Sequence, residues 1–177
     1  MLKRYYPSQY VNSVFAIEYE KLYRKGYRGI IFDVDNTLVH HGEDSTPQVD
    51  ALFAHIQSLG FRTILLSDNG VSRLERFLEN IDCPYISNAE KPKPEGFWRA
   101  LQQLALPKEQ VVYIGEQVFT DICGANRCGI DNILVRYMRH SENEKIGIKR
   151  TLEKGILWFY FRSRTCQNRL GDIEKEL

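Results

Sequence analysis

Short apolar runs that alternate with helical stretches constrain the fold of this chain more than any other feature. Short apolar runs rich in β-branched residues lie within residues 29–34, 61–67, 111–115 and 130–136, with a shorter candidate at 84–87. Such runs are typical of parallel strands buried on both faces. Apolar residues recur at helical spacing over residues 47–59, 72–81 and 94–106. The alternation predicts an α/β fold, with three Rossmann-like layers and helices on both faces of a central parallel sheet.

The helix expected at residues 47–59 also carries signals for its two ends. Thr46 is a suitable N-cap, and Pro47 follows it at the first helical position. Gly60 is a typical residue for ending a helix. These signals predict where this helix begins and ends.

The length and composition fit one globular domain. The chain has 177 residues, of which 43% are apolar and 27% charged, an ordinary balance for such a domain. We expect a core at about residues 28–140, an N-terminal helical segment at 1–27 and a basic, aromatic C-terminal segment at 145–177. The formal net charge of only +1 argues against a uniformly basic nucleic-acid binder.

Neither export nor a membrane span is indicated by the sequence. The N-terminus lacks the apolar run of a signal peptide, and no stretch approaches the roughly 18 apolar residues of a spanning helix. The four cysteines lack the spacing of zinc sites and disulfide frameworks, which favours free thiols. We therefore expect a cytoplasmic protein.

Two carboxylates, Asp33 and Asp35, follow the first long apolar run within the segment Phe-Asp-Val-Asp-Asn-Thr-Leu. Residues two apart on a strand point to the same side, and ligands of open α/β sheets bind beyond the carboxyl ends of the strands. Neighbouring carboxylates repel each other unless a cation or a shared proton intervenes. This pattern indicates a Mg²⁺ site, a nucleophile with a general acid, or both. Incidental acids in a loop are the alternative.

Three further polar motifs follow later strands in the same way. Residues 67–69, Ser-Asp-Asn, precede a helix and could hold a phosphate oxygen at its N-terminus. Lys91 opens the rigid Lys-Pro-Lys-Pro segment, where a lysine can balance phosphate and carboxylate charge. Glu116 and Asp121 return acids to a strand end. Each motif alone could be a helix cap, a solvated lysine or a surface acid, but chance does not readily explain all of them in this order.

In this order the motifs resemble those of the haloacid dehalogenase superfamily of phosphatases: DxDxT, then Ser or Thr, then Lys, then an acidic motif. The resemblance covers at least residues 29–136. The segments Asp-Val-Asp-Asn-Thr-Leu-Val, Leu-Ser-Asp-Asn and Lys-Pro-x-Pro are more narrowly similar to subclass IIIA and its YqeG family. Residues 7–27 and 126–129 fit that family too. The family is similar to mitochondrial phosphatases that hydrolyse phosphatidylglycerophosphate.

The resemblance implies a role for each motif. Asp33 would be the nucleophile that forms an aspartyl-phosphate. Asp35 would protonate the leaving alcohol and then activate water, and its backbone carbonyl would bind Mg²⁺. Ser67 would hydrogen-bond the transferring phosphoryl group. Lys91, in preference to Lys93, would offset the charge of Asp33 and the phosphate.

The resemblance also implies a Mg²⁺ site completed by Glu116 and Asp121 together with Asp33 and Asp35. Glu116 departs from the family, which has aspartate there, so either Asp121 contributes more to the metal site or metal affinity falls. Four more residues of these motifs would contact the substrate: Asn36, Thr37, Asp68 and Asn69.

The spacing of the motifs leaves no room for a cap domain in either place where the superfamily inserts one. An open site suits a large substrate or one presented at a surface. Residues 145–169 carry seven basic residues and one acid around the aromatic-rich segment 156–161. This composition is typical of a helix at an anionic membrane surface, but a helix that packs its aromatic side chains on the core is the alternative. The same basic segment could meet nucleic-acid phosphates.

Together these features predict a Mg²⁺-dependent phosphomonoesterase acting on phosphatidylglycerophosphate or a similar lipid-linked phosphate. The expected partners are a phosphorylated substrate and a membrane surface to which the protein is peripheral, and oligomerisation stays open. A phosphatase of nucleic-acid ends or of phosphoproteins is the alternative enzyme. Glu116 suggests another class, a catalytically weakened binding or regulatory module.

Overall fold

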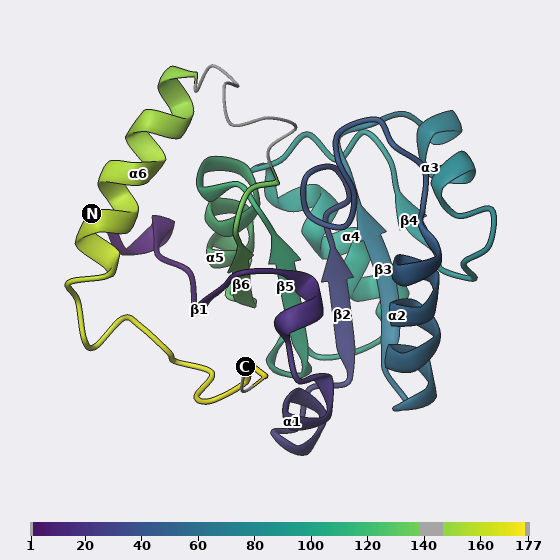
Figure 1. Ribbon diagram of the computed structural model, residues 1–177, viewed down its shortest axis with the longest axis horizontal. Coiled ribbons are helices and arrows are strands. Elements are labelled where there is room, and N and C mark those ends of the chain that lie inside the picture. Colours follow the sequence, from purple (N-terminus) through teal and green to yellow (C-terminus); the bar gives the residue numbers. More distant parts are fainter. Residues whose placement is uncertain (1, 139–146, 176–177) are drawn as a thin grey trace.

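The computed structural model describes residues 2–138 and 147–175, so Lys145 and parts of the expected segments at 28–140 and 145–177 lie outside the described residues. It contains a parallel six-stranded sheet (Figure 1) with strand order β1-β6-β5-β2-β3-β4. The strands are β1 (Gln9–Val11), β2 (Gly29–Phe32), β3 (Arg62–Leu66), β4 (Tyr85–Ile86), β5 (Val111–Gly115) and β6 (Asp131–Val135). The predicted α/β class and parallel sheet are confirmed.

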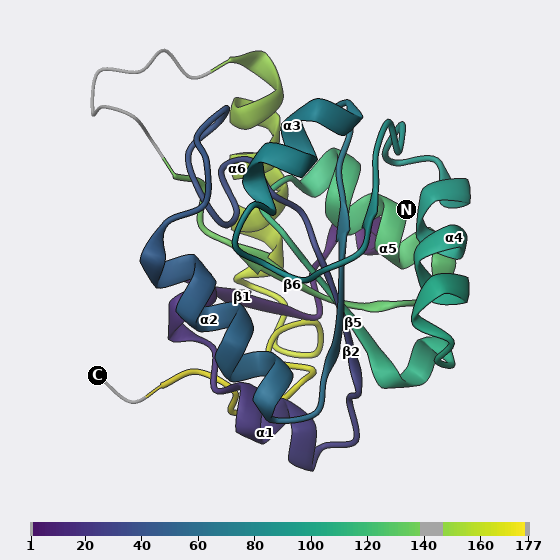
Figure 2. The same cartoon turned by 90° about the vertical axis from the view of Figure 1, so that its right-hand side faces the viewer.

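Helices cover both faces of this sheet, which gives the three predicted layers (Figure 2). One face packs against α1 (Tyr19–Arg24), α2 (Pro47–Ser58) and α3 (Val71–Phe77). The other packs against α4 (Pro94–Leu104) and α5 (Cys123–Cys128). Short helical turns lie at Leu2–Tyr5, Val14–Ala16 and Lys108–Gln110, and a π-helical turn at Val118–Ile122 leads into α5.

The central strands are apolar throughout because both of their faces are buried. In β2, Ile30 and Phe32 belong to the core under α2, whereas Ile31 belongs to the core under α4. All three are fully buried. β2 pairs in parallel with both β3 and β5, so the residues that follow these strands emerge at the same edge of the sheet.

The boundary signals of α2 act as predicted. The Thr46 side chain accepts a hydrogen bond from the Val49 backbone N–H at 3.3 Å, and Pro47 begins the helix. Gly60, with φ of +95°, takes the left-handed conformation just after the helix ends. The third helix is shorter than the predicted 72–81 because α3 ends at Phe77, although Ile81 still packs in the core.

The N-terminal segment differs from the expected helical one. Residues 9–11 form β1, which pairs in parallel with β6 and makes the sixth strand of the sheet. A three-residue edge strand is too short to show a periodicity in sequence. The rest of the segment is α1 and short helical turns, as expected.

The C-terminal segment folds back on the body of the molecule. α6 (Ile148–Tyr160) packs Ile156 against Val118 and Leu134 beyond the β1–β6 edge of the sheet. The chain then passes below the sheet in Figure 1, where Ile173 is buried beside α1. Neither residues 33–46 nor residues 67–93 contain an added domain, so the absence of a cap agrees with expectation.

The packing of α5 on α4 predicts a strong difference between two glycine-to-alanine substitutions. A Cβ at Gly124 would lie 2.3 Å from the ring of the fully buried Phe97, whereas one at Gly155 in α6 meets nothing within 4 Å. We expect Gly124→Ala to lower the free energy of unfolding by about 1–3 kcal/mol through overpacking. Gly155→Ala should leave it unchanged or raise it by up to about 1 kcal/mol. Urea unfolding measures both, and equal stability of the two variants would contradict the packing.

Candidate active site

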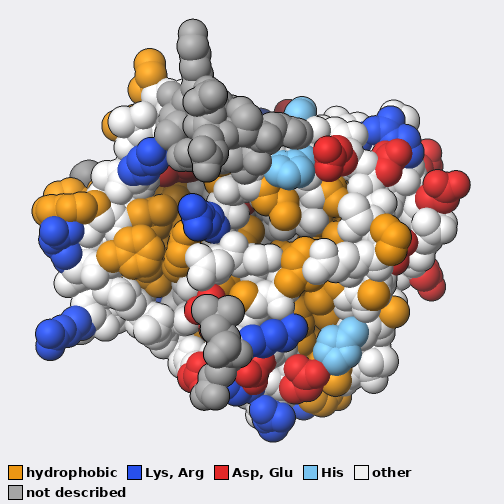
Figure 3. Space-filling view, in the orientation of Figure 1, with side chains coloured by type: hydrophobic (Ala, Val, Ile, Leu, Met, Phe, Trp, Pro, Cys, Tyr) orange, Lys and Arg blue, Asp and Glu red, His pale blue; other side chains and the backbone are white. Residues whose placement is uncertain are grey.

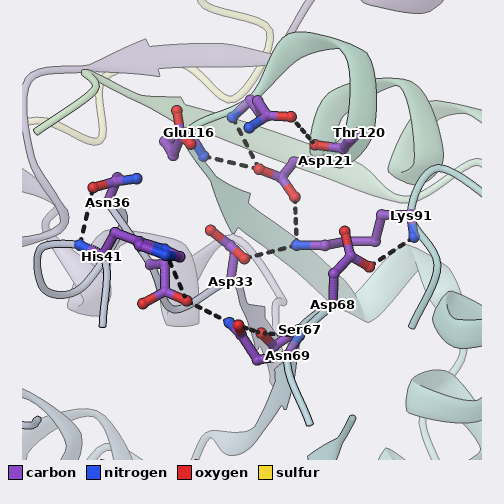
Figure 4. A pocket seen from close by; sticks show the side chains of 12 residues that line it. Asp33, Asn36, His41, Ser67, Asp68, Asn69, Lys91, Glu116, Thr120 and Asp121 are labelled. Carbon is purple, nitrogen blue, oxygen red and sulfur yellow. Dashed lines mark hydrogen bonds and ion pairs between the residues drawn. The ribbon is translucent and has the colours of Figure 1, made fainter. Parts of the chain in front are cut away.

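The four motifs meet in one pocket at the carboxyl edge of the sheet (Figure 4). Every predicted site residue except Thr37 lines this pocket, and Thr37 contacts it through Asp33. The lining residues are Asp33, Asp35, Asn36, His41, Ser67, Asp68, Asn69, Lys91, Glu116, Gln117, Thr120 and Asp121.

Asp33 is held in a fixed orientation directly after β2. One carboxylate oxygen accepts a hydrogen bond from the Lys91 ammonium group and the other from the Thr37 hydroxyl, both at 2.7 Å. Its backbone N–H continues the ladder to Ile114. Burial raises the pKa of Asp33 to about 6 against the opposing pull of Lys91. The result is a buried, oriented carboxylate that is largely ionised at neutral pH.

Lys91 is the cation at the centre of the pocket. Its side chain is only 4% exposed, and its ammonium group lies 2.7 Å from both Asp33 and Asp121. Burial alone would lower the pKa of Lys91, but Asp121 and Asp33 outweigh it and raise it. The backbone N–H of Lys91 donates to Asp68 at 2.8 Å. Lys93 is instead exposed at the surface, where it pairs with Glu90.

Asp121 is fully occupied as a hydrogen-bond acceptor. One of its oxygens accepts from Lys91 and from the Tyr113 hydroxyl, each at 2.7 Å. The other accepts from the backbone N–H groups of Glu116 and Gln117, at 3.1 and 2.9 Å. A carboxylate has about four acceptor positions. Direct coordination of a metal by Asp121, as expected from the sequence, would therefore require one of these donors to move.

Glu116 is paired with an arginine from the far end of the chain. Arg150 in α6 donates to the Glu116 carboxylate at 2.6 Å and to its backbone carbonyl at 3.3 Å. Glu153, one turn further along α6, accepts from Arg150 and from the Val118 backbone N–H, both at 2.9 Å. Burial raises the pKa of Glu116 to about 8 although Arg150 opposes this. α6 thus holds the loop that carries Glu116.

Asp35 lies at the mouth of the pocket among several donors. Asn69 donates a short hydrogen bond to it, Arg73 contacts it at 3.0 Å, and the Gly42 N–H donates at 2.9 Å. Burial alone would raise the pKa of Asp35, but Gly42, Arg73 and Asn69 together lower it. Ser67 accepts hydrogen bonds from the backbone and side-chain amides of Asn69, so its own hydroxyl proton can be donated into the pocket.

Sequence reasoning missed His41, Gln117 and Thr120, which line the pocket. It also missed three residues that contact the acids of the site. Tyr113 lies inside an apolar strand, where a tyrosine is read as core. Arg73 has no motif of its own, yet its side chain is mostly buried against Asp35. Arg150 was one of several basic residues in the C-terminal segment, and nothing in its spacing linked it to Glu116, 34 residues earlier.

The donor groups of the pocket fit a hard divalent cation. Buried Asp33 and Glu116 both line it, and burial raises the pKa of each, so a bound cation would favour their ionised forms. In the described part of the chain, no three side chains of Asp, Glu, His or Cys form a ready metal cluster. Backbone oxygens and water would complete the site, an arrangement that Mg²⁺ commonly adopts. Coordination by Asp33, Asp35, Glu116 and Asp121 stays a prediction.

Comparison with known proteins assigns the family. The family model of haloacid dehalogenase-like hydrolases matches residues 42–129, which include Ser67, Lys91, Glu116 and Asp121. The probable phosphatase YqeG of Bacillus subtilis is 36% identical over 159 residues, which cover 89% of this chain and 92% of that protein. The chain belongs to the YqeG family of haloacid dehalogenase-like phosphatases. The resemblance inferred from the motifs is thereby confirmed.

The chain is also similar, at lower sequence identity, to other proteins. Phosphatidylglycerophosphate phosphatase 1 of Arabidopsis thaliana is 25% identical over 171 residues, covering 85% of this chain and 49% of that protein. The chain thus spans about half the length of that relative. A crystal structure of an uncharacterized protein from Listeria monocytogenes superimposes with a TM-score of 0.53 at 18% identity, covering 77% of this chain and 99% of that one. That likeness shows a shared fold.

The buried pair of Glu116 and Arg150 predicts a non-additive effect on stability. Arg150→Ala leaves the buried carboxylates of Glu116 and Glu153 without their cation and should lower the free energy of unfolding of this phosphatase by about 3 kcal/mol. Adding Glu116→Gln removes one of these two unpaired carboxylates and should restore part of the loss. Urea unfolding of the single and double variants measures the coupling.

Lys149→Ala, which removes the exposed neighbouring cation, serves as the matched control and should change stability little. Strictly additive losses for Arg150→Ala and Glu116→Gln would contradict a direct interaction.

Proposed function

We propose that this phosphatase is Mg²⁺-dependent, forms an aspartyl-phosphate on Asp33, and acts on phosphatidylglycerophosphate or a similar lipid-linked phosphate. The observation that carries the proposal is the position of Asp33. It is a buried carboxylate fixed by Thr37 and Lys91 at the base of the pocket, and the described residues contain no cap domain that would cover it. A fixed nucleophile beside a buried cation suits phosphoryl transfer, which depends on positioning and charge neutralisation.

In the first step, a carboxylate oxygen of Asp33 attacks the phosphorus of the phosphomonoester. The new phosphorus–oxygen bond forms as the bond to the alcohol breaks, and Asp35 gives the leaving oxygen its proton. Lys91 offsets the charge on Asp33 and on the phosphoryl oxygens, and Ser67 donates a hydrogen bond to one of them. Because Thr37 and Lys91 already orient Asp33, little reorganisation precedes the attack.

In the second step, water attacks the phosphorus of the aspartyl-phosphate. Asp35 takes a proton from this water, the bond to Asp33 breaks, and inorganic phosphate leaves with the Asp33 carboxylate restored. The lowered pKa of Asp35 keeps its carboxylate ionised, so that it is able to accept a proton here. In the first step it must instead carry a proton, so its contacts with Arg73 and Asn69 have to loosen as substrate binds.

Haloacid dehalogenase-like phosphatases generally use a divalent metal. Bound beside Asp33, Mg²⁺ would neutralise the charge of an incoming phosphate and so allow a carboxylate to approach it. Asp33, Glu116 and the backbone carbonyl of Asp35 are the groups that we propose to hold it.

Two features support a lipid-linked substrate. The pocket lies open at the edge of the sheet, without a cap that would enclose a small metabolite. The Arabidopsis relative and one from Chlamydomonas reinhardtii, 27% identical over 146 residues, are named as phosphatidylglycerophosphate phosphatases.

Phosphate release from a panel of substrates tests this proposal. We expect release from phosphatidylglycerophosphate in mixed micelles to exceed release from a soluble aryl phosphate, a 5′-phosphorylated oligonucleotide and a phosphopeptide. Chelation of Mg²⁺ should abolish it, and added Mg²⁺ should restore it. Asp33→Asn should lower it by on the order of 10³-fold or more, because the nucleophile is lost.

Asp44→Asn, which changes an exposed acid outside the pocket, is the matched control and should retain activity. Release from the oligonucleotide or the phosphopeptide in preference to the lipid would contradict the lipid-linked substrate but would still support phosphomonoester hydrolysis. Absence of release from all four substrates would instead support a binding or regulatory module.

A further inference from the structure

We propose that the outer face of α6 docks this phosphatase on an anionic lipid surface. The docking elements are an apolar stripe made of Ile148, Leu152, Trp158 and Phe159, which we call the α6 stripe, and the cations that flank it. The proposal rests on the proposed lipid-linked substrate, and it adds the surface through which the enzyme would reach that substrate.

α6 carries one buried and one exposed apolar surface. Its inner face buries Ile156 and Tyr160 against the body of the protein. Its outer face exposes Ile148 by 82%, Leu152 by 57% and Phe159 by 52%. These outer residues recur four and seven positions apart, with Gly155 between them, so they form one line along the helix. The described part of the chain covers the inner residues and leaves this outer line exposed.

Trp158 extends this line into a broader patch. Its side chain is 50% exposed, its ring meets that of Phe159 edge-on at 4.8 Å, and the Arg162 guanidinium lies 3.4 Å from the ring centroid. Large exposed apolar patches usually mark contact surfaces. Amphipathic rings beside cations are typical of residues at a membrane interface.

The charges around the α6 stripe identify the partner. Lys149, Lys154, Arg162 and Arg164 are all exposed, whereas Glu153, the sole acid between residues 147 and 165, is buried. At 3.6 residues per turn, Lys149 and Lys154 lie on opposite flanks of the stripe. This is the arrangement of a helix that lies in a lipid interface, with its apolar face in the acyl region and its cations at anionic headgroups. Figure 3 shows apolar and basic side chains together on the side where α6 lies.

The same charges argue against other occupants. A second copy packed on the stripe across a two-fold axis would bring its own cations against these. Nucleic acid would use cations and aromatic rings, but the aliphatic Ile148 and Leu152 offer bases no stacking surface. An anionic lipid surface satisfies both the cations and the aliphatic side chains.

The stripe also lies close to the active site. Arg150, on the inner side of the first turn of α6, reaches Glu116 in the pocket. In Figure 1 this turn is the upper end of α6, on the side toward which the strand arrows point. No helix in the described ranges is long and apolar enough to span a bilayer, so the contact would be at the surface. Docking through α6 would bring the open pocket to the headgroups.

The two tryptophans of the chain allow a direct test with the full-length protein. Trp98 on α4 is 55% exposed and lies outside the stripe, so Trp98→Phe leaves Trp158 as the only tryptophan. With vesicles of phosphatidylglycerol and phosphatidylcholine, we expect its emission to shift to the blue and to be quenched by brominated acyl chains. Salt should weaken this binding, and vesicles of phosphatidylcholine alone should cause little change in the emission.

Variants then assign the binding to the stripe. Leu152→Ser combined with Phe159→Ser should lower vesicle partitioning by at least about tenfold. Trp98 is an exposed aromatic residue on another helix, so Trp98→Ser should leave vesicle partitioning unchanged. Both proteins should hydrolyse a soluble aryl phosphate at the wild-type rate, which confirms that the pocket is intact.

The outcomes separate docking from the proposed function. Binding to anionic vesicles without hydrolysis of phosphatidylglycerophosphate would support docking but contradict this lipid as the substrate. Hydrolysis of the lipid with no emission change and no vesicle partitioning would overturn docking and leave the substrate standing. Concentration-dependent dimerisation that the Leu152→Ser/Phe159→Ser variant abolishes, without vesicle binding, would overturn docking in favour of self-association.

Discussion

The buried ammonium group of Lys91 is the interaction on which the active site depends. It lies 2.7 Å from Asp33 and from Asp121, so it joins the ends of β2 and of the turn after β5 through one charge. Two buried carboxylates without this cation would repel each other and lose solvation. The parallel pairing of β2 with β5 puts both acids at the same edge of the sheet, and the segment after β4 brings the lysine to them. The sheet topology and the charge balance of the pocket therefore depend on each other.

A second charged pair links the site to the end of the chain. Arg150 pairs with Glu116, and Glu153 fixes both Arg150 and the backbone of Val118. The inner face of α6 thus holds a residue that lines the pocket, whereas its outer face exposes apolar side chains. Because one helix contributes to both, a contact made by α6 outside the molecule can affect the loop that carries Glu116.

The fold could be predicted where local signals were strong. β2, β3, β5 and β6 are mainly apolar runs, and α2 has its cap at Thr46 and its proline at Pro47. β1 is a three-residue edge strand whose place depends on its pairing with β6, so its sequence gave no signal. The site motifs were recognisable because each follows a strand. The pairing of Arg150 with Glu116 could not be predicted, since it depends on where α6 packs. The sequence left two interpretations of the aromatic C-terminal segment, a helix at a membrane surface and a helix packed on the core. The structure has features of both, because Tyr160 is buried in the core whereas Phe159 is exposed.

The central claim is that Asp33 carries the phosphoryl group during turnover. It can be tested by rapid quenching of the enzyme with phosphatidylglycerophosphate and Mg²⁺, followed by borohydride, which reduces an acyl phosphate to an alcohol. Peptide mass spectrometry then locates the reduced residue. The account predicts a homoserine at position 33 that forms only with substrate present. Phosphate release without modification at position 33, or with the label on another residue, would contradict it.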